Sequence, residues 1–221
     1  MKGHQFSDQE ASTLEQILQH RRDVRGNQFL DKPIAKADLE RILLAGTSAP
    51  SVGFSQPWEF VVVDDLATRQ RIHAIFAEEN RLAQAQFNGT RGDQYRTLKL
   101  EGILESALNL AVFYRPSSEP VLGQTSMSEV GRYSVVCAVQ NMWLMARSLN
   151  IGMGWVSILS SAKVRDVLAA PTDRELIAYL CLGYAKEFYT NPELERLQWQ
   201  KRKQLSDLVY WNRHSPEEKP S

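Results

Sequence analysis

The chain has 221 residues and carries 26 Lys plus Arg against 26 Asp plus Glu, so its formal net charge is zero. Nucleic-acid binders draw much of their affinity from cationic contacts to phosphates, and this balance therefore argues against a nucleic-acid partner. With 43% hydrophobic residues the chain is also too apolar for a disordered protein. We predict a single domain over residues 1–221, with a core of about residues 11–210 and flexible termini.

The shortness of the apolar runs and the scattered positions of the histidines argue against a membrane protein and against a metal site. No run approaches the ~20 residues that cross a bilayer, and the N-terminus lacks the pattern of a signal peptide, so no membrane association is expected. The 4 histidines have no metal-ligand spacing with acids or cysteines, so we expect no metal site. We interpret Cys137 and Cys181 as buried free thiols of a cytoplasmic protein.

The first predicted elements are two helices. Ser7 and Glu10 form the pattern of a capping box, and the helix that they open is expected to stop near Gly26. A second helix is predicted over about residues 37–46, followed by a loop at residues 49–53, which are rich in small residues and Pro.

The remaining predicted elements alternate between helices and strands along the chain. In chain order they are strand 58–63, helix 66–87, a polar mobile segment 88–93, helix 95–104, strand 108–114, loop 115–128, helix 133–149, strand 155–159, helix 161–168, strand 176–182 and helix 193–204. Helix 133–149 is apolar nearly all round, which indicates the central buried helix. This interleaving favours one layered sandwich of helices and strands.

A cluster of arginines follows the first predicted helix. Arg21, Arg22 and Arg25 lie within five residues. They either complement the dipole at a helix C-terminus or clamp a phosphate or carboxylate, since guanidinium suits bidentate contacts to oxyanions. Asp23 between them either offsets their charge or is a buried acid–base group, whose pKa nearby cations lower and desolvation raises.

Two segments of small residues are further candidates. Residues 50–58 contain serines and Gln56, whose hydroxyl and amide groups suit a heterocycle, although the composition also fits a plain turn. Residues 152–154 read Gly-Met-Gly and begin like a dinucleotide-binding fingerprint. They open a strand, however, and Ser157 stands where the third glycine belongs, so we exclude a Rossmann site. These glycines instead predict the end of a helix and the close approach of another backbone.

Taken together, these segments resemble the flavin-dependent nitroreductase superfamily. The resemblance rests on Arg-Arg-Asp-Val-Arg at 21–25, on Pro-Ser-Val-Gly-Phe-Ser-Gln-Pro-Trp at 50–58 and on Gly-Trp-Val-Ser-Ile at 154–158. It implies an α+β fold, namely a three-layer sandwich in which helices flank a central, mostly antiparallel sheet. It also implies a homodimer that binds flavin mononucleotide (FMN) between its subunits.

Finer details resemble the branch of the superfamily that consumes its flavin. Asp23 replaces the usual Ser, and Phe54 stands where nitroreductases usually have Asn. The resemblance implies that reduced FMN and molecular oxygen react to give 5,6-dimethylbenzimidazole, the lower ligand of cobalamin, and erythrose 4-phosphate. A separate flavin reductase would supply the reduced FMN. The alternatives are an NAD(P)H-dependent FMN reductase or nitroreductase, and a non-catalytic flavin-binding dimer.

The resemblance also implies roles for single residues. Asp23 is the expected acid–base group at the ribityl carbon next to the ring, and Ser157 is expected to hydrogen-bond the ring. Residues 86–93 are the expected lid, with Gln86 at a position that is commonly Met. The expected FMN contacts are Arg21, Arg22, Asp23, Val24, Arg25, Pro50, Ser51, Ser55, Gln56, Leu100, Ser157 and, near the phosphate, Arg202.

Overall fold

A computed structural model describes residues 3–214 and divides the chain into two compact units, Met1–Phe188 and Tyr189–Ser221. The second unit contains the short helix α7 (Glu193–Arg196) and a 3₁₀ turn at Leu205–Asp207. The predicted helix over 193–204 is therefore wrong beyond its first turn. Gln198 adopts a left-handed backbone with φ of 57°, which is a conformation that ends helices.

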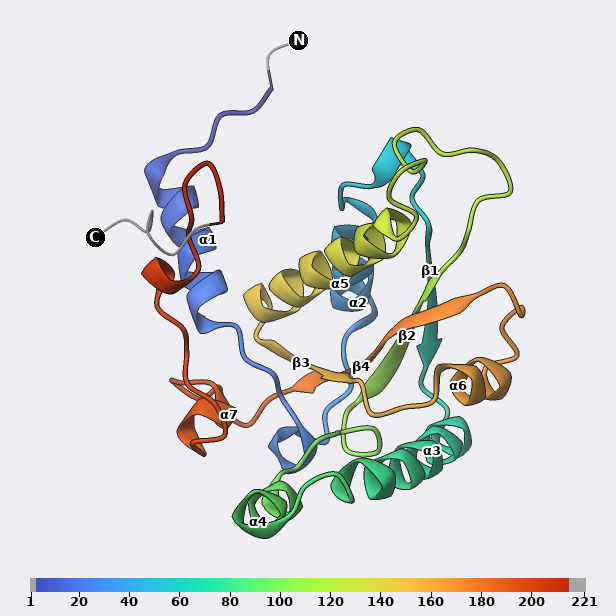
Figure 1. The fold of residues 1–221 in the computed structure, drawn as a ribbon, viewed down its shortest axis with the longest axis vertical. Helices are drawn as coiled ribbons and strands as arrows, with labels where there is room; N and C mark the ends of the chain where they lie inside the picture. The colour runs from blue at the N-terminus through green and yellow to red at the C-terminus, as the bar shows by residue number, and fades with distance from the viewer. Residues whose placement is uncertain (1–2, 215–221) are drawn as a thin grey trace. The chain divides into compact units, whose positions relative to one another are not determined.

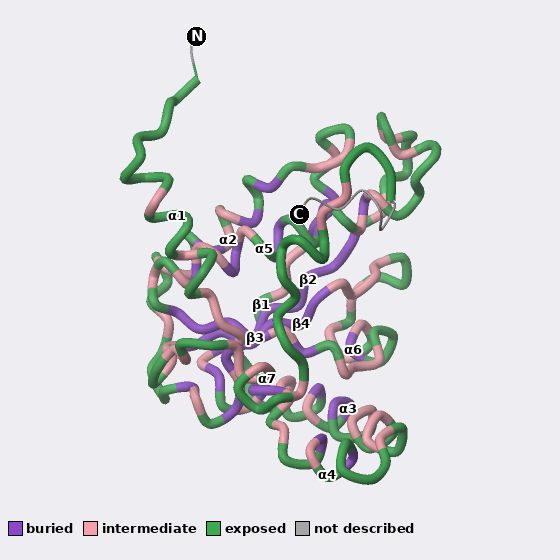
Figure 2. The backbone as a smooth tube through the Cα atoms, turned by 60° about the vertical axis from the view of Figure 1, so that its left-hand side comes forward, coloured by how far each residue is buried: buried purple, intermediate pink, exposed green. Residues whose placement is uncertain are grey.

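Four antiparallel strands form the sheet of the first unit. β1 (Trp58–Val63), β2 (Leu108–Tyr114), β4 (Glu175–Tyr184) and β3 (Ile151–Val156) lie side by side in that order. Each described pairing is antiparallel, as expected. Every residue of the central strand β2 is buried, and the middle of its neighbour β4 is buried as well (Figure 2).

Helices cover both faces of this sheet. α2 (Lys36–Thr47) and α5 (Val130–Ser148) pack on one face, and α3 (Leu66–Gln84) and α6 (Ser161–Val167) lie on the other (Figure 1). Two hydrophobic clusters follow the same division, one with side chains of α2 and α5 and the other with side chains of α3 and α6. The expected α+β three-layer sandwich is confirmed.

The long helix α5 presents one face to the core and one to the outside. Its buried residues recur at helical spacing, which confirms it as the central packed helix. Cys137, however, lies on the outward face and is exposed, whereas Cys181 on β4 is buried. The interpretation of Cys137 as a buried thiol is therefore wrong, because its position on the helix turns it away from the sheet.

The region between α3 and β2 also differs from its prediction. The expected mobile segment 88–93 and helix 95–104 are replaced by one helix, α4 (Gly89–Thr97), and by an irregular turn. Tyr95 anchors α4, since its ring stacks on Phe87 at 4.8 Å and its hydroxyl donates to Asn80 Oδ1 at 2.8 Å. These tertiary contacts hold a polar, glycine-containing helix that local propensity disfavours.

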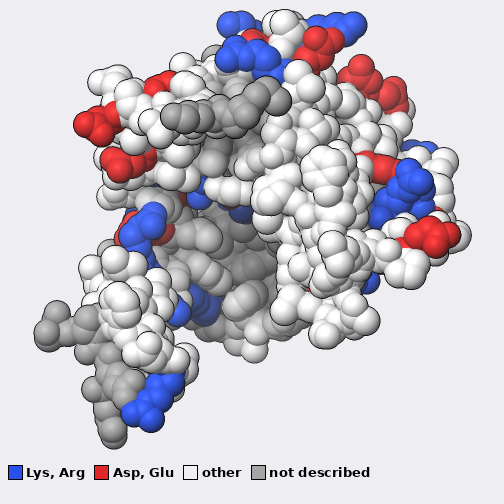
Figure 3. Space-filling view, turned by 90° about the horizontal axis from the view of Figure 1, so that it is seen from above, with Lys and Arg blue, Asp and Glu red and all other residues white. Residues whose placement is uncertain are grey.

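Charged side chains of both signs are scattered over the surface. Figure 3 shows Lys and Arg intermixed with Asp and Glu on one face, without a broad area of a single sign. Within residues 3–214, no helix is long and apolar enough to cross a membrane. The same residues contain no group of three or more His, Cys, Asp or Glu that could hold a metal ion.

Candidate functional site

The arginine segment is extended and lies against β3. α1 (Asp8–His20) opens with the predicted capping box but ends before the arginines, because Arg21 has an extended backbone with φ −66° and ψ 133°. Asp23 forms a parallel bridge with Met153, and the Val24 N–H donates to the Met153 carbonyl at 3.1 Å. The prediction that this helix continues to Gly26 is wrong, because residues 21–24 extend the edge of the sheet instead.

Two glycines of β3 make this close contact possible. A Cβ atom on Gly152 would lie 2.8 Å from a methyl group of Val24, and one on Gly154 would overlap the Val24 carbonyl oxygen. Only residues without a side chain allow the two backbones to approach this closely. The expected close approach at residues 152–154 is confirmed. The expectation that these glycines end the preceding helix is wrong, because α5 ends at Ser148 and Asn150 takes the left-handed conformation with φ of 56°. β3 begins at Ile151 rather than at the predicted residue 155, because residues 151–154 pair with β4.

Asp23 is held from two sides. Its Oδ2 accepts a hydrogen bond from the Arg25 guanidinium, and its Oδ1 accepts one from the Trp155 N–H at 3.3 Å. Desolvation raises the pKa of the Asp23 carboxyl above its ordinary value, although Arg25, the Trp155 N–H and Arg21 act in the opposite direction. The effect of burial therefore outweighs that of the cations, a balance that the sequence alone left open.

The turn after α4 supports Arg25 from the other side. The Leu100 carbonyl accepts a hydrogen bond from Arg25 Nη1 at 3.2 Å, and the Glu101 carbonyl accepts one from the Gly26 N–H at 2.8 Å. Glu101 is buried, and its carboxylate pairs with Lys99 at 2.6 Å. Leu100 is among the residues predicted from the sequence, whereas Lys99 and Glu101 are not, because no local pattern marks a carboxylate in a turn as buried.

Helix α5 contacts the other two arginines. The ring of Trp143 lies under the Arg21 guanidinium, 4.7 Å from it, and its Nε1 donates to the Arg22 carbonyl at 3.3 Å. Arg22 Nη1 donates in turn to the Gln19 carbonyl at 2.7 Å. The indole of Trp143 is therefore both a core side chain and a support for the arginine segment.

The second predicted segment, residues 50–58, attaches near the other end of α5. There, Ser134 Oγ accepts a hydrogen bond from the Val52 N–H at 3.1 Å. Ser134 and Trp143 are nine residues apart, which is about 14 Å along a helix. Phe54 and Gln56 adopt left-handed φ angles of 54° and 47°. Such strain costs free energy, and it is found most often at binding and active sites.

Ser55 and Gln56 line a cavity of about 700 Å³, whose wall includes Trp58. Ser55 Oγ is buried, yet none of the described residues supplies it with a hydrogen-bond partner. Ser51 has a structural contact, because its Oγ accepts the Gln56 N–H at 3.1 Å. Pro50 is exposed. Ser55 therefore lines this cavity and carries a buried hydroxyl that has no partner among the described residues.

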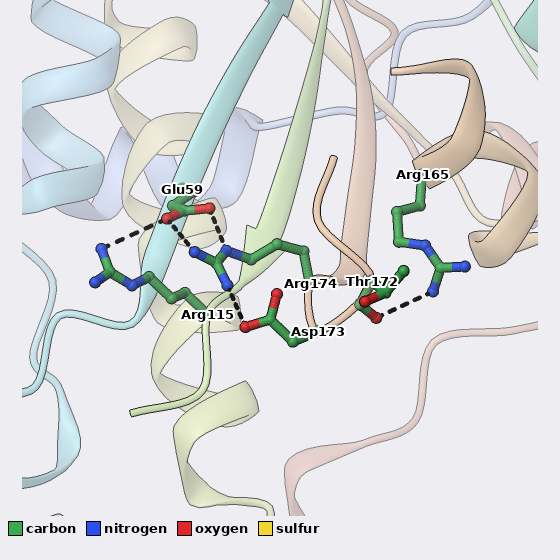
Figure 4. Close-up of polar contacts among 6 residues, drawn as sticks. All are labelled: Glu59, Arg115, Arg165, Thr172, Asp173 and Arg174. Atoms are coloured by element: carbon green, nitrogen blue, oxygen red, sulfur yellow. Dashed lines mark hydrogen bonds and ion pairs between the residues drawn. The ribbon is translucent and has the colours of Figure 1, made fainter. Parts of the chain in front are cut away.

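The arginines beside the cavity are paired with carboxylates. Glu59 on β1 accepts hydrogen bonds from Arg174 at 2.6 and 3.2 Å and lies 3.6 Å from the Arg115 guanidinium (Figure 4). Asp173 pairs with Arg174 at 2.6 Å. Two positive and two negative charges thus balance within this cluster, so it is not a strong site for an anion.

Besides Leu100, two further expected site residues lie outside both segments, namely Ser157 and Arg202. Ser157 is exposed and directly follows β3, two residues or about 7 Å of extended chain after Trp155. Arg202 belongs to the second unit, where its side chain is exposed and its backbone N–H donates to Glu195 Oε1 at 3.3 Å. The expected contacts of Ser157 and Arg202 with a ligand stay predictions.

Comparison with known proteins gives a matching family model and curated relatives that cover most of the chain. Residues 18–184 match the model of the nitroreductase family. The chain is 45% identical over 192 residues to a 5,6-dimethylbenzimidazole synthase of Rhodospirillum rubrum, which covers 86% of this chain and 90% of that protein. It is 36% identical over 197 residues to a synthase of the same name from Rhodobacter capsulatus, covering 88% and 94%.

Solved structures share the fold at lower sequence identity. An iodotyrosine deiodinase bound to FMN and 3-iodo-L-tyrosine has a TM-score of 0.71 at 20% identity, covering 90% of this chain and 99% of that one. A putative nitroreductase from Desulfovibrio desulfuricans in complex with FMN has a TM-score of 0.62 at 20% identity, covering 92% and 98%. From the family model and the curated relatives together, the chain belongs to the nitroreductase family.

Proposed function

We propose that this protein is an oxidoreductase that makes 5,6-dimethylbenzimidazole by oxygen-dependent fragmentation of reduced FMN, with erythrose 4-phosphate as the second product. The observation that carries the proposal is Asp23, a carboxyl with a raised pKa that Arg25 and the Trp155 N–H hold inside an arginine segment. The two synthases, 45% and 36% identical over most of both chains, support the same reaction.

The residues present fit a flavin mononucleotide. The arginine segment offers guanidinium donors for a phosphate, and the buried, unpaired hydroxyl of Ser55 offers a hydrogen bond to a ligand. Reduced FMN, when bound, supplies the electrons that oxygen accepts and the ring that becomes the benzimidazole. The proposed contacts are those expected from the sequence, namely Arg21, Arg22, Asp23, Val24, Arg25, Pro50, Ser51, Ser55, Gln56, Leu100, Ser157 and Arg202.

Asp23 is the proposed acid–base group. We assign to its carboxylate the removal of the proton from the ribityl carbon next to the ring. Its raised pKa makes it a stronger base than an ordinary Asp carboxylate. Arg25 on Oδ2 and the Trp155 N–H on Oδ1 fix its orientation, which lowers the entropic cost of proton transfer. Ser157 is the proposed hydrogen-bonding partner of the ring.

We infer that residues 1–221 form one nitroreductase-like domain and that a second copy completes the site. α5 anchors the two proposed FMN-binding segments about 14 Å apart along its axis, so a neighbouring copy could bring the complementary segment to each. The outward face of α5 carries Tyr133 and Val136, which are 54% and 40% exposed and lie at helical spacing. Wild-type protein should sediment as a dimer, and Val136→Glu should weaken that dimer.

The proposed reaction is tested with purified protein and chemically reduced FMN in air, with the benzimidazole detected by mass spectrometry. A flavin reductase with NAD(P)H should replace the chemical reductant, because we propose that a separate reductase supplies the substrate. Recovery of the flavin only as oxidised FMN would contradict the proposal. Direct oxidation of NAD(P)H would indicate an ordinary FMN reductase or nitroreductase, and tight binding without turnover would indicate a flavin carrier. The expected cytoplasmic location stays a prediction.

A further inference from the structure

An ion pair between a buried carboxylate, that of Glu101, and an exposed ammonium group, that of Lys99, lies beside the turn that contains Arg25 and Gly26. Glu101 is only 3% exposed, and its carboxylate accepts the Ile103 N–H at 2.7 Å and pairs at 2.6 Å with Lys99 Nζ, which also pairs with Glu105 at 2.8 Å. A buried carboxylate costs free energy even when it is paired, and a partner exposed to solvent attracts it less strongly than a buried one would. The position of this pair therefore calls for an explanation other than stability.

The turn at residues 99–103 contacts Arg25 and Gly26 at three points. The Leu100 carbonyl holds the Arg25 side chain, and the next carbonyl along the chain, that of Glu101, holds the Gly26 N–H. The methylenes of Lys99 cover Gly26, which has a left-handed φ of 46° and no room for a Cβ atom. The Glu101 carboxylate holds this turn in shape, because it binds both Lys99 and the Ile103 N–H.

We propose that Glu101, with Lys99 as its counter-ion, is a positioning residue that fixes Arg25 and, through Arg25, the carboxylate of Asp23. The proposal rests on the proposed acid–base role of Asp23. Glu101 acts through the turn: its carboxylate fixes the backbone, the backbone carbonyls fix Arg25 and Gly26, and the Arg25 guanidinium fixes Asp23 Oδ2. Loss of the pair should leave the fold in place and loosen the contact between Arg25 and Asp23.

The charged and titratable groups around Asp23 determine how its pKa changes when Arg25 is held less firmly. Asp23 faces Arg25, Arg21, the Trp155 N–H and the thiol of Cys181. Burial raises the pKa of Cys181 to about 12, so this thiol stays neutral over the working range. Arg25 lowers the pKa of Asp23, and a less firmly held Arg25 should therefore let that pKa rise.

The test is the double variant Lys99→Met with Glu101→Gln. It removes one positive and one negative charge together, so the net charge near Asp23 does not change. Met still covers Gly26, and the Gln amide oxygen can still accept the Ile103 N–H. We expect the pKa of Asp23, measured by ¹³C NMR in the ligand-free protein, to rise by at least ~0.5 unit. The pH below which the rate of benzimidazole formation falls should rise together with this pKa.

The matched control is Lys163→Met with Glu78→Gln, because that ion pair also has a 2.6 Å contact but joins α6 to α3 at the surface. It should shift neither the pKa of Asp23 nor the pH profile. If the double variant does not fold, Glu101→Asp keeps the charge, shortens the reach to Lys99, and should shift the pKa in the same direction by less.

An unchanged Asp23 titration in a folded variant would overturn the proposal, even if the variant melts at a lower temperature, because a purely structural ion pair predicts that result. A downward shift would overturn it too. Failure of the wild-type protein to make the benzimidazole would reject the proposed function instead, and the NMR titration would still decide whether Glu101 positions Asp23.

Discussion

The two segments that we propose to bind FMN are held in opposite ways. The segment at 21–26 is extended and takes its shape from distant neighbours, namely the glycines of β3 and the turn at 99–103. The loop at 50–58 takes its shape from its own backbone, with left-handed residues at 54 and 56 and the Ser51 hydroxyl bonded to Gln56. The first is thus placed by tertiary packing, whereas the second combines a strained backbone of its own with the hydrogen bond from the Val52 N–H to Ser134 of α5.

The largest expected effect tests the packed segment. Gly154→Ala places a Cβ atom against the Val24 carbonyl, a backbone atom that cannot turn aside as a flexible side chain could. We expect a loss of about 2–3 kcal/mol in the free energy of unfolding, measured by urea denaturation. Gly3→Ala is the control, because a Cβ atom there meets nothing within 4 Å. Wild-type stability of Gly154→Ala would show that the close contact with β3 is not needed.

A smaller effect tests the strained loop. Ser55→Ala removes a buried hydroxyl that has no partner among the described residues, so the free energy of unfolding should change by less than about 0.5 kcal/mol. If that hydroxyl binds FMN, affinity should fall about fivefold, which corresponds to about 1 kcal/mol and is measurable by flavin fluorescence.

Ser134→Ala is the matched control for this loop. Ser134 Oγ accepts the Val52 N–H and donates to the Val130 carbonyl, so its loss should destabilise the protein by about 1–2 kcal/mol. A destabilising Ser55→Ala together with a neutral Ser134→Ala would reverse the assignment of the two hydroxyls.

The smallest expected effect is in the pH dependence. Because burial raises the pKa of Asp23, its carboxylate should take up a proton at a pH above ~3.9, the ordinary value for Asp. Benzimidazole formation by a base at this position should fall as the pH decreases through that raised pKa. Initial rates at saturating reduced FMN give this limb directly. A rate that stays constant down to about pH 4 would argue against Asp23 as the base.

The sequence predicted the elements that local patterns define and missed those that tertiary contacts define. β1 and β2 have the predicted limits, because β-rich apolar runs are bounded there by Pro57 and Arg115. β3 was placed late, because its first residues are rich in glycine and become a strand only against β4 and residues 23–24. α4 was missed because its stability comes from the stack of Tyr95 on Phe87 rather than from helix propensity.

The candidate site also contains residues that local motifs predicted and residues that only tertiary contacts reveal. Of the residues that the motifs predicted, the structure brings Asp23, Arg25 and Leu100 together through Arg25, and their roles in binding and catalysis stay predictions. The sign of the Asp23 pKa shift could not be read from the sequence, since it depends on how far the fold buries the carboxyl. Glu101 was missed for the same reason, because its importance comes from burial beside a turn that no spacing rule predicts.

The most direct test of the account compares wild-type protein with Asp23→Asn in a single turnover, with one equivalent of reduced FMN in air. Benzimidazole and returned FMN are counted in the same sample, and FMN binding is measured separately. We predict that the wild type yields benzimidazole, whereas Asp23→Asn binds FMN and returns it intact, because the amide cannot take up the proton. Benzimidazole formation by Asp23→Asn at the wild-type rate would contradict the central claim.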